Sequence, residues 1–282
     1  VVEAVFEDRK VKADVIATSD FGDLDAYVDV FHAIHFMRNS KVLLISPAAN
    51  ARRGEEFTKQ YGTQIAAPSY ADLKAAYDAA DVSQARKMAD EFARGAVRVV
   101  EPSRNAIVDS TRLYLAMRDF LRRQKANAIA IDCLGGFRRN DLPAYPCVGF
   151  SKLNDEGKYR VCECDLNSTM TQLLITSLAD VPGFVTDPVF DTSRNEVIHA
   201  HCVSATKMKG IDGPSYPYII RNHLETNEGA VVQVMMPSAE TITVARFVDP
   251  RRFLVSTAEV TGAVMDSDRG CRSQIRTRVA DA

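Results

Sequence analysis

The sequence predicts an α/β fold in which a Rossmann-like domain with a parallel sheet is followed by a mainly antiparallel β domain. In roughly the first 180 residues, helical periodicities alternate with short continuous apolar runs, which suit parallel strands covered on both faces. Beyond them, short alternating segments separated by turn residues take over, as in antiparallel sheets or barrels. A chain of 282 residues has room for two domains of ordinary size.

Composition excludes several classes of protein. Hydrophobic residues make up 46% of the chain and charged residues 26%, which is ordinary for a globular protein and excludes collagen-like, disordered and coiled-coil chains. With 35 basic and 37 acidic side chains the net charge is -2, too balanced for sequence-independent nucleic-acid binding. No apolar run approaches the roughly 18 residues that span a bilayer. We expect neither nucleic acid nor membrane as a partner.

The start of the chain and its cysteines suggest where the protein works. Residues 1–10 contain acids where a signal peptide needs a basic start, and there is no initiator Met. We therefore expect residues 1–20 to be a lead-in from a preceding domain of a longer chain. Six cysteines lie between residues 133 and 271 without a regular framework, and a chain of this size does not need disulfides. The sequence predicts reduced thiols in a cytoplasmic protein.

The predicted α/β domain covers residues 21–180. Its first helix runs from Leu24 to about Arg38, with apolar residues three and four positions apart, and we expect His32 and His35 beside this stripe to serve packing or an interface. A continuous apolar strand follows over 42–45. Later segments of the domain are helices at 71–80, 83–95 and 105–124 and a strand at 128–131.

A strand end in this domain is the first place where chemistry is expected. After residues 132–136, a loop runs through Pro143 and Pro146 to Cys147, and loops of this length are usually functional. A short strand over 160–164 is then followed by Asp165, which can cap the next helix. Glu163 is therefore expected where a strand runs into a helix, at the sheet edge where α/β proteins bind ligands.

The predicted β-rich domain covers residues 181–282, after a boundary near 179–183. We expect it to be the catalytic domain and to be incomplete at its C-terminus, because a strand pattern is still running at 274–279 when the chain ends. Its other strand-like segments are 197–201, 230–235, 241–244 and 253–256.

Two acids and two histidines are candidate ligands for a divalent metal. Glu163 is one, and Asp187 is expected at the end of an apolar strand that begins at Gly183. His199 and His201 alternate with apolar residues, so both imidazoles face one side of a strand, and such a pair near carboxylates suits a divalent metal. The alternative for Glu163 is an exposed acid at a strand end, and that for Asp187 is a turn residue before proline. The alternative for the two histidines is that structural hydrogen bonds hold them.

Other residues support weaker hypotheses. Arg221 and His223 are expected to share a strand face, where they can bind hydroxyl or anionic groups or simply face solvent. A zinc site built from cysteines and a histidine departs from the usual ligand spacing, and a cysteine nucleophile lacks a supporting motif. The residues of that alternative zinc site are Cys162, Cys164, His201 and Cys202.

The run over residues 161–174 and the segment 182–187 resemble the catalytic stretch of the L-fucose isomerases and the wider fucose/arabinose isomerase group. Asp187 follows Glu163 by 24 residues, as the metal-binding Asp does in that family. The resemblance implies a homo-oligomeric, manganese-dependent isomerase in which Glu163 is base and metal ligand, Asp187 is a catalytic acid and ligand, and His201 is a further ligand. Mg²⁺ or Co²⁺ are alternatives to Mn²⁺.

The implied reaction interconverts aldoses and ketoses through an enediol, with Arg221 and His223 near a monosaccharide. A divalent cation stabilises the enediol oxygens, and a carboxylate moves the proton between adjacent carbons. The family's last histidine ligand would follow Ala282, since no His occurs after His223. The alternative is a non-catalytic sugar-binding or regulatory protein of the same fold.

Overall fold

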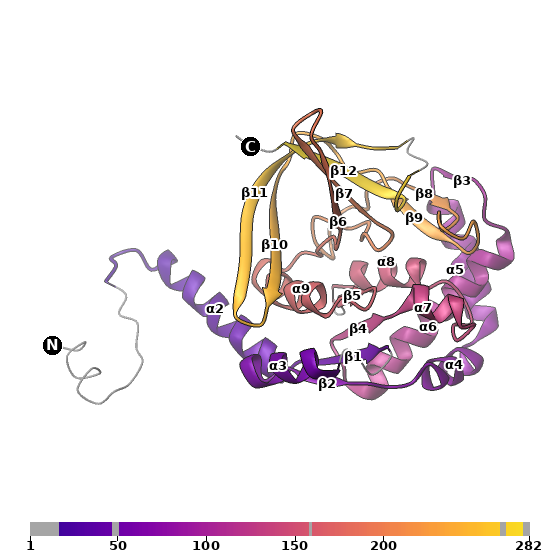
Figure 1. The fold of residues 1–282 in the computed structure, drawn as a ribbon, viewed down its shortest axis with the longest axis horizontal. Helices are drawn as coiled ribbons and strands as arrows, with labels where there is room; N and C mark the ends of the chain where they lie inside the picture. The colour runs from indigo at the N-terminus through magenta and orange to yellow at the C-terminus, as the bar shows by residue number, and fades with distance from the viewer. Residues whose placement is uncertain (1–16, 47–50, 158–159, 266–268, 279–282) are drawn as a thin grey trace.

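The structure is a computed structural model that describes residues 17–46, 51–157, 160–265 and 269–278. It contains a parallel sheet with helices around it and two further sheets formed mainly by the second half of the chain (Figure 1). This arrangement confirms the predicted fold class. No helix among the described residues is both long enough and apolar enough to cross a membrane.

The parallel sheet has four strands in the order β2-β1-β4-β5. Both of its predicted apolar strands are confirmed, because the buried runs 42–45 and 128–131 lie at its centre. Side chains on one face join the main hydrophobic cluster, and those on the other face join a second cluster, so the sheet is covered on both sides. The strands are β1 (Lys41–Ile45), β2 (Gln64–Ala66), β4 (Ala128–Ile131) and β5 (Arg160–Cys162).

Helices surround this sheet, and the predicted ones are present. The described helices are α2 (Gly22–Asn39), α3 (Ala51–Tyr61), α4 (Tyr70–Ala79), α5 (Val82–Gly95), α6 (Arg104–Gln124), α7 (Cys133–Arg138), α8 (Cys147–Asp155) and α9 (Leu166–Ala179). The apolar stripe of α6 is buried, whereas α2 buries only Ala33 and Met37. Since His32 and His35 are exposed, they do not pack against the core.

The second half of the chain supplies most of two further sheets. An antiparallel sheet has the order β10-β11-β12-β7-β6, and a smaller one the order β3-β8-β9. Its short strand β3 comes from the first half and pairs in parallel with β8, and the main hydrophobic cluster also draws on both halves. The strands are β3 (Arg98–Val99), β6 (Asp187–Asp191), β7 (Glu196–His201), β8 (Tyr218–Arg221), β9 (Val231–Val234), β10 (Thr241–Asp249), β11 (Arg252–Ala263) and β12 (Ser273–Arg278).

Two local predictions are wrong, and one helix was not predicted. The stretch directly after β4 contains α7, because the Asp132 side chain accepts a hydrogen bond from Gly135 N at 3.0 Å and caps a short helix. Strand β6 begins at Asp187 instead of ending there, and Pro188 is tolerated because β6 is an edge strand. Strand β8 ends at Arg221, so His223 does not share its face. Val279, the end of the last predicted strand, lies outside the described residues.

Candidate functional site

Glu163 lies in the turn between β5 and α9, at the carboxyl end of the parallel sheet. The strand stops at Cys162, and Cys164 adopts a left-handed conformation with φ of 46°, which turns the chain sharply. Asp165 then caps α9 by accepting a hydrogen bond from Ser168 N at 3.1 Å. The sequence therefore predicted the strand-to-helix junction correctly and placed the strand end two residues too late.

The three residues expected as metal ligands come together in the structure. His201 Nε2 lies 3.6 Å from Glu163 Oε2 and 3.9 Å from Asp187 Oδ2. His201 ends β7 and Asp187 begins β6, and the antiparallel pairing of Asp187 with Ala200 brings these two side by side. Glu163 reaches them from the parallel sheet. The site thus lies where the two sheets meet, and we refer to Glu163, Asp187 and His201 as the acid–imidazole cluster.

The pKa of Glu163 is suited to proton transfer. Its side chain is 25% exposed, against 80% for Asp187. Burial, and to a smaller degree the negative charges of Asp187, Glu225 and Asp132, raise the pKa of Glu163 to about 7, although a hydrogen bond with the Cys133 thiol opposes the shift. Near neutral pH this carboxyl group can both accept and release a proton.

His201 is oriented by its own backbone. Its Nδ1 accepts a hydrogen bond from the amide of Cys202 at 2.8 Å, so the proton of a neutral ring is on Nε2. Burial lowers the pKa of His201, despite the opposing charges of Asp187 and Asp165, and the ring is neutral at pH 7. As it stands, Nε2 presents a proton to the two carboxylates.

The donor types of the cluster fit a divalent cation. Carboxylates and an imidazole suit Mn²⁺ and Mg²⁺. Bonds of about 2.1 Å place neighbouring ligands of one octahedral ion about 3 Å apart and opposite ligands about 4 Å apart. The separations of 3.6 and 3.9 Å lie between these two values, so binding one ion would require the side chains to shift. In the described part of the chain, however, no three His, Cys, Asp or Glu side chains are grouped closely enough to hold a metal. Coordination by His201 Nε2 would also require its proton to move to Nδ1.

The other predicted polar residues have different surroundings. His199 is buried between two threonines, with Nε2 3.0 Å from Thr277 Oγ1 and Nδ1 3.3 Å from Thr186 Oγ1. This arrangement supports the structural alternative for that histidine.

Arg221 and His223 have different partners in the structure. Arg221 forms an ion pair with Glu101, with Nη2 2.6 Å from Oε1. His223 is buried beside the rings of Phe137 and Tyr145, and its charge contributes to lowering the pKa of His201. His223 therefore acts electrostatically on a member of the acid–imidazole cluster, and sugar binding by either residue stays a prediction.

Four thiols lie near the cluster, and the sequence reasoning had singled out only Cys202 among them, as part of the alternative zinc site. Cys147, Cys202 and Cys271 pack together, and Cys133 forms a hydrogen bond with Glu163. Burial and then the charge of Glu163 raise the pKa of Cys133 well above its ordinary value, and a hydrogen bond with Cys147 and burial do so for Cys202. Both are therefore neutral at pH 7, which argues against a cysteine nucleophile. The sequence signals were the position of Cys133, directly after β4, and that of Cys202, next to His201.

Comparison with known protein families and with curated proteins finds no relative of this chain. No model of a known protein family matches the chain, and no curated protein matches it. The resemblance to the fucose/arabinose isomerase group therefore rests on the motif residues around Glu163 and Asp187. Any assignment of function depends on these residues and on the geometry of the cluster.

Proposed function

We propose that the protein is a metal-dependent aldose–ketose isomerase, similar to L-fucose isomerase, that acts on a monosaccharide through an enediol. The observation that carries this proposal is the convergence of Glu163, Asp187 and His201 from two sheets. A cytoplasmic location and a homo-oligomeric assembly belong to the same proposal.

Glu163 is the proposed base. Isomerisation takes a proton from one carbon next to a carbonyl and returns it to the neighbouring carbon, so a single carboxyl group must work in both directions. A catalytic pKa near the operating pH is optimal for this. Burial raises the pKa of Glu163 to about 7 in the absence of metal, and a bound cation would lower it. The Cys133 thiol, which bonds to Glu163, would orient the carboxyl group.

Asp187 and His201 complete the proposed site. The Asp187 side chain is 80% exposed, so substrate oxygens can reach it, and it can exchange protons with them. Mn²⁺, with Mg²⁺ or Co²⁺ as alternatives, would be held by Glu163 and Asp187, and by His201 once its proton is on Nδ1. A bound cation would supply stabilisation of the negative charge on the enediol oxygens.

Turnover of a panel of aldoses with Mn²⁺ tests the proposed reaction. We expect Glu163→Gln to lower turnover by about 10² to 10⁴-fold, the usual worth of a general base, and to retain the fold by circular dichroism. Glu55→Gln, the same change at an exposed position of α3, should behave like the unmodified protein. Full activity of Glu163→Gln would contradict the proposal. Sugar binding by calorimetry without turnover of any aldose would favour the non-catalytic alternative.

Binding of the metal can be tested separately by electron paramagnetic resonance of added Mn²⁺. We expect one bound ion per chain in the unmodified protein and loss of that signal in Asp187→Asn. Asp191→Asn, at the far end of the same strand, is the matched control and should bind Mn²⁺ normally. Equal binding by all three proteins would show that the metal is held elsewhere.

A further inference from the structure

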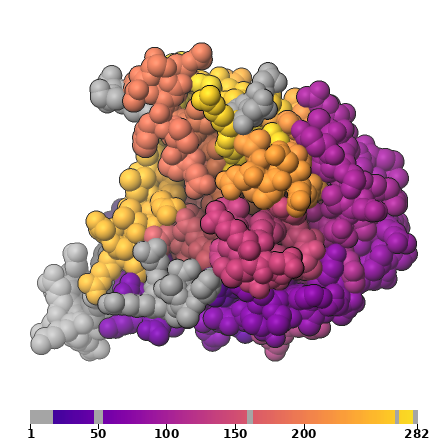
Figure 2. Space-filling model, turned by 45° about the vertical axis from the view of Figure 1, so that its right-hand side comes forward, coloured from indigo at the N-terminus to yellow at the C-terminus, as the bar shows by residue number. Residues whose placement is uncertain are grey.

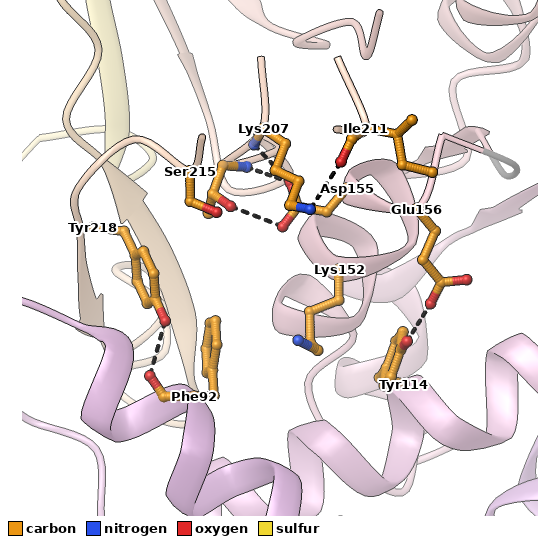
Figure 3. Close-up of a pocket in the computed structure, with 10 residues that line it drawn as sticks. Phe92, Tyr114, Lys152, Asp155, Glu156, Lys207, Ile211, Ser215 and Tyr218 are labelled. Atoms are coloured by element: carbon orange, nitrogen blue, oxygen red, sulfur yellow. Dashed lines mark hydrogen bonds between the residues drawn. The ribbon is translucent and has the colours of Figure 1, made fainter. Parts of the chain in front are cut away.

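A cavity of about 420 Å³ lies away from the acid–imidazole cluster, between α5, α6, the C-terminal end of α8 and the segment 206–218 (Figure 3). In the space-filling view the region around these elements forms part of an irregular surface (Figure 2). The walls of the cavity combine aromatic rings with charged groups. The aromatic part consists of Phe92, Tyr114 and Tyr218.

Lys152 is the one lining cation for which we find no hydrogen bond or ion pair with a described residue. Its Nζ lies 5.2 Å from the centre of the Phe92 ring and 5.5 Å from that of Tyr114, and Figure 3 shows it between these two walls of the pocket. Burial lowers the pKa of Lys152, and the carboxylates of Asp155, Glu156 and Glu91 oppose this only from beyond ion-pair distance.

The other charged groups of the pocket are already engaged. Asp155 accepts hydrogen bonds from Thr206 N at 2.6 Å and Lys207 N at 2.8 Å, and it thereby fixes the loop that forms one wall. Glu156 accepts a hydrogen bond from the Tyr114 hydroxyl. Lys207 Nζ donates to the carbonyl of Ile211 at 2.8 Å. Lys152 is therefore the free charge to which a ligand can bind.

We propose that this pocket binds a small organic anion with a flat apolar body, whose carboxylate or phosphate group pairs with the Lys152 ammonium. The body would lie against Phe92 and Tyr218, whose rings stack with centroids 5.0 Å apart. Such a ligand gives Lys152 a directly bonded anion and covers aromatic surface.

The pocket is distinct from the acid–imidazole cluster. The two sites lie at opposite ends of α8, because Cys147 at its start packs against Cys202, the neighbour of His201, whereas Asp155 at its end lines the pocket. Eight residue steps of a helix span about 12 Å. Loss of ligand binding here would therefore leave the proposed isomerisation unchanged, and the two proposals can fail independently.

Saturation-transfer NMR and calorimetry on the full chain test this proposal with benzoate, phenyl phosphate and the neutral benzamide as probes. We expect at least one of the two anions to bind and benzamide to bind at least about tenfold more weakly, because a charge-assisted hydrogen bond is lost. Stronger binding of phenyl phosphate than of benzoate would identify a phosphate-bearing ligand, and the reverse order a carboxylate.

Lys152→Met keeps the apolar stem and removes the charge, so we expect binding of the anion to fall at least about tenfold. Lys87→Met, at an exposed position of α5, is the control and should bind normally. A melting temperature of Lys152→Met no lower than that of the unmodified protein shows that the pocket is intact. Equal binding of benzamide and benzoate, unchanged binding by Lys152→Met, or no binding of either anion would overturn the proposal.

Discussion

Two partly buried glutamates differ in the charges that surround them. Glu101 and Glu163 have similarly exposed side chains, 31% and 25%. Burial alone would raise the pKa of both, but hydrogen bonds from Arg221 and the Asn222 amide bring the pKa of Glu101 below its ordinary value. Glu163 faces acids and a neutral imidazole, and its pKa rises to about 7. The difference is a facing cation, which indicates a structural role for Glu101 and leaves Glu163 as the proposed base.

The largest expected effect on stability comes from breaking the ion pair between Glu101 and Arg221. Arg221→Met leaves the Glu101 carboxylate without its cation, and we expect the free energy of unfolding to fall by about 3 to 4 kcal/mol. Urea denaturation measures the change. Arg104→Met, which breaks the exposed pair with Asp90, is the control and should unfold like the unmodified protein.

A second substitution sharpens this test. Adding Glu101→Gln to Arg221→Met should restore part of the lost stability, because it removes the unpaired buried charge. If Arg221→Met alone is as stable as the exposed-pair control, the pair is not structural and the contrast with Glu163 fails.

The stability contribution of Glu163 should decrease as the pH rises, because its pKa is raised, whereas the pKa of Glu101 is lowered. The pKa of Glu163 is raised from 4.5 to about 7, so its contribution to stability is complete below about pH 4.5 and is lost as the pH rises to about 7. In a chelating buffer, Glu163→Gln should therefore exceed the unmodified protein by up to about 3 kcal/mol at pH 8 and match it near pH 4. Thermal unfolding across this range measures the difference, and a constant difference would contradict a raised pKa.

The smallest effect concerns the two histidines of β7. His199 has both ring nitrogens near threonine hydroxyls, whereas His201 faces the two acids. Thr277→Val leaves a buried ring nitrogen without its partner, and we expect a loss of about 1 to 2 kcal/mol with unchanged turnover. Thr257→Val, on the exposed part of β11, should cost less. A loss of turnover in Thr277→Val would place His199 in the functional site.

Helical periodicity predicted the existence of helices but not their burial. The stripes of α2 and α6 have the same spacing, yet Phe31 of α2 is 69% exposed while Met117 of α6 is fully buried. Which stripe is covered depends on contacts between distant segments, and local spacing does not record those contacts.

The candidate site could be predicted only in part for the same reason. Glu163 and Asp187 were found because a strand-to-helix junction and a motif spacing are local signals. The thiols of Cys133, Cys147, Cys202 and Cys271 come from four separate segments, and the cavity around Lys152 is formed by elements far apart in sequence. Neither arrangement leaves a pattern within one stretch of the chain.

The central claim is that Glu163 carries a proton between adjacent carbons of a sugar. Incubating the protein with aldoses and Mn²⁺ in deuterated water, followed by NMR of the sugars, tests it most directly. We predict deuterium at the carbon beside the carbonyl group with the unmodified protein and none with Glu163→Gln. Equal incorporation by both proteins, or none with either across the whole panel, would contradict the account.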